Sequence, residues 1–186
     1  MRFRRSSFGR PRLGRGSGFG RLPGKARLII ALLMALGGVF TYFRSRQVNP
    51  VTGETQAIAL TTDQEVALGL KSAPRMAAQF GGLDRDADLT ASIERIGERL
   101  VRSTAAQSTP YRFKFQVLKD AQTVNAFALP GGPIFITRGL LKRLTNDAQV
   151  AGVLGHEVGH VVGRHAAEKM AKGQLDKILV GAVGVA

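Results

Sequence analysis

The chain of 186 residues contains no cysteine. Disulfide frameworks, cysteine-ligated zinc sites, thiol catalysis and a lipid-modified N-terminal cysteine are therefore excluded. The length suits one domain of ordinary size with additional segments, and an apolar content of 44% is sufficient for a hydrophobic core.

Acidic residues are also scarce, with 13 Asp and Glu against 27 Lys and Arg. The imbalance is concentrated in residues 1–27, which hold nine basic residues and no acidic one. The rest of the chain has 18 basic and 13 acidic residues and therefore a net charge of only +5. We interpret residues 1–27 as a basic, disordered cytoplasmic tail. An RNA-binding tail and an organelle transit peptide remain open as alternatives, but no aromatic-interleaved basic surface accompanies the tail, so a nucleic-acid partner is not expected.

Residues 28–43 form an uncharged, apolar run of sixteen residues, LIIALLMALGGVFTYF. As a helix it would cover about 24 Å, slightly short of a hydrocarbon core of about 30 Å, and the flanking Lys25, Arg27, Arg44 and Arg46 can reach the headgroups. We expect a single transmembrane anchor that contacts the lipid bilayer. A cleavable signal peptide and a buried core helix are the alternatives.

The excess of basic residues before this span predicts its orientation. By the positive-inside rule the N-terminus stays in the cytoplasm and the rest of the chain lies in the periplasm or another extracytoplasmic space. We expect a linker over residues 44–60, which contain turn signals, and one domain over residues 61–186.

Two helices are expected at the start of this domain. Thr62 and Glu65 have the spacing of a capping box that opens the first helix, which Pro74 should kink or interrupt. The second helix is predicted over residues 87–102 from its apolar spacing. Neither carries a chemical group that indicates function.

The next part has the character of strands. Residues 111–118 alternate between apolar and polar side chains, and residues 123–129 and 134–137 follow, separated by a Pro-Gly-Gly-Pro sequence that marks a turn or a sheet edge. A short helix is expected over residues 139–144. Asn146 and Gln149 then form a capping pair that opens a long helix.

All three histidines of the chain lie in this long helix, and His156-Glu157-Val-Gly-His160 is an H-E-x-x-H motif. Residues four apart share one face of a helix, so His156 and His160 can bind one metal ion, and Glu157 can act as the general base on a metal-activated water. At 100° per residue, Glu157 and His160 lie 100° and 40° from His156, whereas His165 lies at 180°. We therefore predict a structural or second-shell role for His165.

A catalytic zinc site requires three protein ligands. Glu168 lies two turns beyond His160, about 12 Å along a straight helix, which is too far to share its ion. The chain then ends in an apolar run, so we expect a sequence truncated at its C-terminus, with the third ligand beyond residue 186.

Several motifs together resemble one family: Asn49-Pro-Val-Thr-Gly53, the helix that contains Gln64-Glu65 and Gly69, and residues 124–141 and 151–165. The chain resembles the membrane-associated zinc metallopeptidases that include the CAAX prenyl protease, the heat-shock protease HtpX, and the periplasmic and mitochondrial Oma-type quality-control proteases. The single-span layout is most similar to the last of these.

The resemblance implies an α+β fold, a mainly helical zincin-like (gluzincin) metallopeptidase domain with a small sheet next to the H-E-x-x-H helix, preceded by one transmembrane helix. It implies one Zn²⁺ on His156 and His160, catalysis by Glu157, a third Glu ligand on a later helix, and substrate alignment along Asn125, Ala126 and Phe127. An extended polypeptide would add a strand at these three residues.

The expected function is that of a membrane-anchored zinc endopeptidase acting on misfolded or envelope proteins. A membrane-tethered chaperone-like or binding module with an incomplete zinc site is the alternative. The mitochondrial inner membrane is the alternative location.

Overall fold

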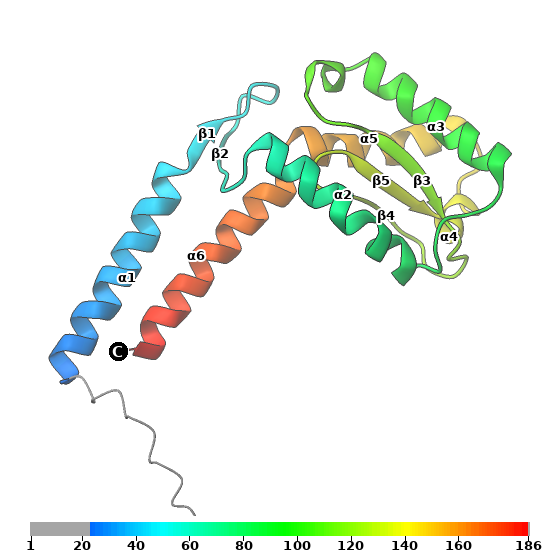
Figure 1. Ribbon diagram of the computed structural model, residues 1–186. Helices are drawn as coiled ribbons and strands as arrows, with labels where there is room; N and C mark the ends of the chain where they lie inside the picture. The colour runs from blue at the N-terminus through cyan, green and yellow to red at the C-terminus, as the bar shows by residue number, and fades with distance from the viewer. Residues whose placement is uncertain (1–22, 186) are drawn as a thin grey trace, which may run out of the picture.

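The computed structural model describes residues 23–185 and has two parts, a layered domain and a pair of long helices that extends from it (Figure 1). Much of the predicted tail 1–27 lies outside the described residues. The elements are α1 (Gly24–Arg44), β1 (Arg46–Val48), β2 (Thr55–Ala57), α2 (Thr62–Gln79), α3 (Ala87–Arg102), the 3₁₀ helix η1 (Ala105–Ser108), β3 (Lys114–Leu118), β4 (Ala126–Ala128), β5 (Pro133–Thr137), α4 (Arg138–Leu141), α5 (Asp147–Val162) and α6 (His165–Val185).

A sheet of three strands lies at the centre of the layered domain. β5 is its middle strand, pairing in parallel with β3 and antiparallel with β4. The predicted α+β class and the three predicted strands are confirmed, although β3 begins at Lys114 rather than at residue 111 and β4 covers only Ala126–Ala128 of the predicted 123–129. The Pro-Gly-Gly-Pro sequence forms the turn between β4 and β5, where Gly131 and Gly132 have φ values of 77° and 127°.

Helices cover both faces of this sheet, which explains why every residue of β5 is buried. On one face the sheet packs against α3 and α5, and on the other it packs against α2. The first face carries Phe115, Val117, Ile134 and Ile136, and the second carries Leu118 and Phe135. The long helix with the histidines is therefore fixed directly on the sheet.

The start of α2 differs from the prediction by one residue. Thr61, not Thr62, is the capping residue, and its partner in the capping box is Gln64, whose side chain accepts a hydrogen bond from the Thr61 amide at 2.8 Å. Glu65 is instead buried and takes part in a tertiary contact described below. Of the kink or interruption predicted at Pro74, the interruption is wrong, since α2 continues to Gln79. Packing of α2 on the sheet on either side of Pro74 maintains the helix there.

Residues 44–60, predicted as a linker, contain an antiparallel hairpin of β1 and β2. The hairpin is attached to the end of α5 by two buried side chains. Asn49 donates to the carbonyl of Val162 at 2.9 Å, and Gln56 donates to the carbonyl of Gly163 at 2.7 Å. The last carbonyls of a helix have no partner within it, so these two side chains act as a C-terminal cap supplied by a distant segment.

The two long helices α1 and α6 lie side by side, away from the sheet (Figure 1). The predicted span 28–43 lies within α1, which is long and apolar enough to cross a membrane. The apolar run near the end of the chain forms the second half of α6.

An ion pair joins the loop after α2 to the start of α4, and it gives the fold a dependence on pH. Arg138 donates to the carboxylates of Asp84 and Asp86. The hydrogen bond from Arg138, followed by that from the Asp86 amide, lowers the pKa of Asp84 below its ordinary value of 3.8. This stabilisation is present above that value and is lost as the pH falls through the lowered pKa of the folded state.

Asp84→Asn should therefore weaken the pH dependence of the free energy of unfolding below pH 3.8. The dependence should not vanish, because hydrogen bonds from Thr123 and from backbone amides also lower the pKa of Asp120. Urea unfolding over a series of acidic buffers measures the slope of the free energy of unfolding against pH for parent and variant. Equal slopes would contradict a contribution from Asp84.

Candidate metal centre and substrate cleft

The helix that carries the histidines begins where the sequence predicts. Asn146 caps α5 by accepting a hydrogen bond from the amide of Gln149 at 3.0 Å. The Gln149 side chain, however, accepts from the amide of Thr145 rather than from that of Asn146. Buried apolar residues on α5 fix its rotation on the sheet, namely Val150, Leu154, Val158 and Val161.

His156 and His160 lie one turn apart with their rings in contact. Their Nε2 atoms are 3.1 Å apart. Two nitrogens bound to one tetrahedral zinc ion at about 2.0–2.1 Å would be separated by about 3.3 Å. The pair therefore fits zinc in donor type and in spacing. Within residues 23–185 no group of three or more His, Cys, Asp or Glu side chains is arranged to hold a metal ion.

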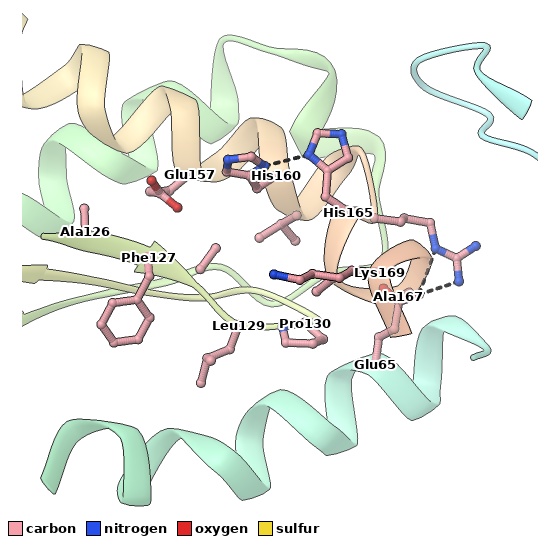
Figure 2. Close-up of a pocket in the computed structure, with 14 residues that line it drawn as sticks. Glu65, Ala126, Phe127, Leu129, Pro130, Glu157, His160, His165, Ala167 and Lys169 are labelled. Atoms are coloured by element: carbon pink, nitrogen blue, oxygen red, sulfur yellow. Dashed lines mark hydrogen bonds and ion pairs between the residues drawn. The ribbon is translucent and has the colours of Figure 1, made fainter. Parts of the chain in front are cut away.

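Glu157 faces a cavity of about 360 Å³ that separates α5 from β4 (Figure 2). It is only 8% exposed, and His160 lines the same cavity. His156 is exposed on the outer side of the pair. The helical positions predicted for these three residues thus agree with the structure, while their roles stay predictions.

His165 is not on the far side of a continuous helix, and this part of the prediction is wrong. α5 ends at Val162, and the chain turns at Gly163 and at Arg164, which has a left-handed φ of 55°. The turn brings Nδ1 of His165 to 2.6 Å from Nδ1 of His160 (Figure 2). Gly163 makes room for this ring, because a Cβ there would lie 2.6 Å from Nε2 of His165.

A buried ion pair holds this turn in place. Nε of Arg164 donates to Oε1 of Glu65 at 2.8 Å, and the same guanidinium donates to the carbonyl of Leu60 at 2.8 Å. The Glu65 side chain is 2% exposed, and its other oxygen accepts from the hydroxyl of Tyr111 at 3.1 Å. Burial, followed by the charge of Glu65, raises the pKa of Tyr111 to about 12, so this hydroxyl stays a donor at neutral pH.

The three residues predicted to align a substrate lie in or next to β4, the edge strand of the sheet as far as the described strands go. Antiparallel pairing directs alternate residues toward the neighbouring strand. Asn125 accepts from the Thr137 amide and Leu129 donates to Pro133, so the backbone groups of Asn125, Phe127 and Leu129 face β5. The backbone groups of Ala126 and Ala128 therefore face the open edge.

Side chains of β4 divide between the cavity and the core. Ala126 points toward Glu157, whereas the ring of Phe127 points away from it (Figure 2). That ring stacks on Phe135 with centroids 5.1 Å apart and packs on Phe80. Ala126 and Phe127 line the cavity, while Asn125 is not among the lining residues.

Nine residues that line this cavity were not predicted as site residues from the sequence, and four of them matter to its chemistry or to the exposed strand edge. Ala128 lines the cavity next to the predicted strand residues, and Glu65, Arg164 and Lys169 line its far end. Glu65 had been assigned to a capping box, and Arg164 and Lys169 had no distinguishing signal. The alternation of β4 was the one signal that could have identified Ala128.

Residues 87–186 match peptidase family M48. The chain is 34% identical over 125 residues to the beta-barrel assembly-enhancing protease of Yersinia pestis. The aligned residues make up 67% of this chain and 25% of that protein. It is 33% identical over 165 residues to the beta-barrel assembly-enhancing protease of Escherichia coli (strain K12), covering 86% of this chain and 33% of that protein. It is also 29% identical over 145 residues to the mitochondrial metalloendopeptidase OMA1 of Schizosaccharomyces pombe, and the alignment covers 77% of this chain and 42% of that protein.

This chain thus spans between a quarter and about two fifths of the length of these relatives. The matched residues contain the sheet, the histidine pair and every residue that lines the cavity except Glu65. The resemblance predicted from the motifs is confirmed, because the family match takes in more than half of the chain: the chain belongs to peptidase family M48.

Proposed function

We propose that this chain is the membrane-anchored catalytic part of a zinc-dependent endopeptidase that hydrolyses misfolded or membrane and envelope proteins. The observation that carries the proposal is the placement of His160 and the buried Glu157 on a cavity whose opposite wall is the edge strand β4. The names of the relatives, a beta-barrel assembly-enhancing protease and a mitochondrial metalloendopeptidase, support the same class of activity.

In this proposal His156 and His160 would hold one Zn²⁺ through Nε2, and a third protein ligand would come from outside the described residues. Zinc, when bound, supplies a Lewis acid that polarises the attacking water and the scissile carbonyl. With Nε2 of His160 reserved for the metal, its Nδ1 carries the hydrogen and donates to Nδ1 of His165. His165 thereby fixes the ring orientation and the tautomer of His160.

Glu157 accepts the proton of the attacking water and later delivers it to the leaving amine. Its position beside β4 suits this role, since an extended substrate paired with the open edge would pass across the carboxylate. The substrate backbone would hydrogen-bond to Ala126 and Ala128, which provides affinity with little sequence preference. Phe127 supports the strand from the core side.

The proposed location is a membrane that α1 crosses. Nine basic residues precede the span, which favours a cytoplasmic N-terminus and a peptidase domain on the periplasmic or extracytoplasmic side. In a mitochondrion the corresponding location would be the inner membrane.

Casein cleavage by the full-length protein in detergent tests the proposal. We expect cleavage that a chelator abolishes and stoichiometric zinc restores. The alternative, a chaperone-like module, predicts suppression of casein aggregation without any cleavage. Absence of cleavage in the zinc-loaded protein would overturn the proposed activity.

A further inference from the structure

The second half of α6 differs sharply from the first. The charged residues of α6 all precede Ile178, and residues 178–185 carry no charge. Val180 and Val183 in this second half are 72% and 78% exposed. A water-soluble domain rarely exposes a contiguous apolar surface of this kind.

This half of α6 lies against residues 27–38 of α1, and the two helices run antiparallel (Figure 1). Ile178 packs on Gly38, where a Cβ would meet its Cγ2 atom at 2.7 Å. At the other end Arg27 donates to the carbonyl of Val185 at 3.1 Å. Residues 178–185 therefore occupy the same level as the first part of the span in α1.

The distribution of side-chain sizes on this helix pair is the reverse of that in a soluble protein. Its buried residues are small, namely Ala31 and Gly38 on α1 and Ala171 and Ala182 on α6. The large apolar residues point outward, and Leu28, Ile29, Leu32, Leu33, Leu36 and Phe40 are each more than half exposed. Small residues at the contact and large ones toward the surroundings are typical of helices that associate within lipid.

We propose that residues 178–185 enter the bilayer beside α1, so that acyl chains cover the outward side chains of both helices. The inference rests on the membrane anchoring in the proposed function. One boundary of the embedded region lies at Lys25 and Arg27. The other lies near Tyr42, Lys172 and Lys177, whose polar ends reach the headgroups.

The embedded pair sets the height of the cleft above the membrane. α6 rises without interruption from Lys172 to His165, seven residues or about 10 Å along its axis. Both Lys169 and His165 line the cavity, so it extends from about 5 Å to about 10 Å above the headgroups. An extended chain covers this distance in about three residues. The favoured substrates are accordingly polypeptide segments that have just left the bilayer.

Single cysteines labelled with the fluorophore NBD test the insertion, because the chain has no cysteine of its own. The full-length protein is reconstituted in vesicles of phosphatidylethanolamine and phosphatidylglycerol that contain lipids with nitroxide-labelled acyl chains, which quench NBD. Val180→Cys and Val183→Cys should be quenched to the same extent as Leu32→Cys on α1. Arg102→Cys on α3 should keep its emission and serves as the matched exposed control.

The outcomes separate the inference from the anchoring on which it rests. Quenching at position 32 without quenching at positions 180 and 183 would overturn the insertion of α6 and leave the anchor in place. Absence of quenching at all three positions would overturn the anchor as well. Circular dichroism of each labelled variant confirms that the helices are retained.

Discussion

Glu157→Gln is expected to reduce kcat/KM for casein or peptide cleavage by about 100- to 10,000-fold, the usual contribution of a general base. Glutamine has the shape of glutamate but cannot accept the proton of the attacking water. Because Glu157 is only 8% exposed and extends from α5 into the cavity beside β4, the isosteric amide should fit without repacking. A fluorogenic peptide derived from a casein cleavage site gives the rate.

Measuring zinc binding distinguishes loss of the general base from loss of the metal site. The variant should bind zinc with the stoichiometry and affinity of the parent, because its histidine pair is unchanged. Glu98→Gln is the matched control, since Glu98 is exposed on α3 and pairs only with Arg102 at 3.3 Å among the residues described. A Glu157→Gln protein that cleaves as fast as the parent would remove Glu157 from the mechanism.

The positions of the histidine pair could be predicted because they depend on local geometry. Residues 156 and 160 share a face of any α-helix, and Asn146 and Gln149 mark where this helix starts. The same holds for α3, whose predicted bounds agree with the structure. In these segments local preference and tertiary packing favour the same conformation.

The turn after α5 could not be predicted, because its cause lies 99 residues away in the sequence. Gly163 is tolerated inside helices and Arg164 favours them, so a local interpretation continues the helix and turns His165 away. The contact with Glu65 and the donors from Asn49 and Gln56 stabilise the turn instead.

The shift in the capping box has the same origin. Thr61 with Gln64 and Thr62 with Glu65 both have the required spacing, so the sequence permits two registers. Burial of Glu65 against Arg164 and Tyr111 selects the first, because a side chain in that contact cannot also cap α2. The hairpin of residues 46–57 was missed because its strands have three residues each and little apolar alternation.

Arg164→Ala should lower the free energy of unfolding by about 3–5 kcal/mol, because it leaves the carboxylate of Glu65 buried without its partner. Glu65→Ala should have an effect of similar size, since it leaves the guanidinium of Arg164, whose side chain is 11% exposed, without its ion-pair partner. Urea unfolding of both variants measures the loss.

The double variant Glu65→Leu with Arg164→Met is the control for this ion pair. It removes both charges together and keeps a side chain of similar volume at each position, so most of the lost stability should return. The left-handed φ of Arg164 costs the same with methionine as with arginine, because neither residue is glycine. Equal stability of the double variant and Arg164→Ala would mean that the charges are not coupled.

The same variants test whether the ion pair also positions the metal centre. Arg164 precedes His165, whose ring contacts His160 at 2.6 Å, so a loosened turn should weaken zinc binding by about 10- to 100-fold, as for other partners of a metal ligand. The apolar double variant can refold the domain without the hydrogen bond from Arg164 to Leu60 that fixes the turn. If the double variant recovers stability but still binds zinc weakly, the ion pair positions the metal centre as well as stabilising the fold. If it recovers both stability and zinc affinity, Glu65 and Arg164 contribute to stability alone.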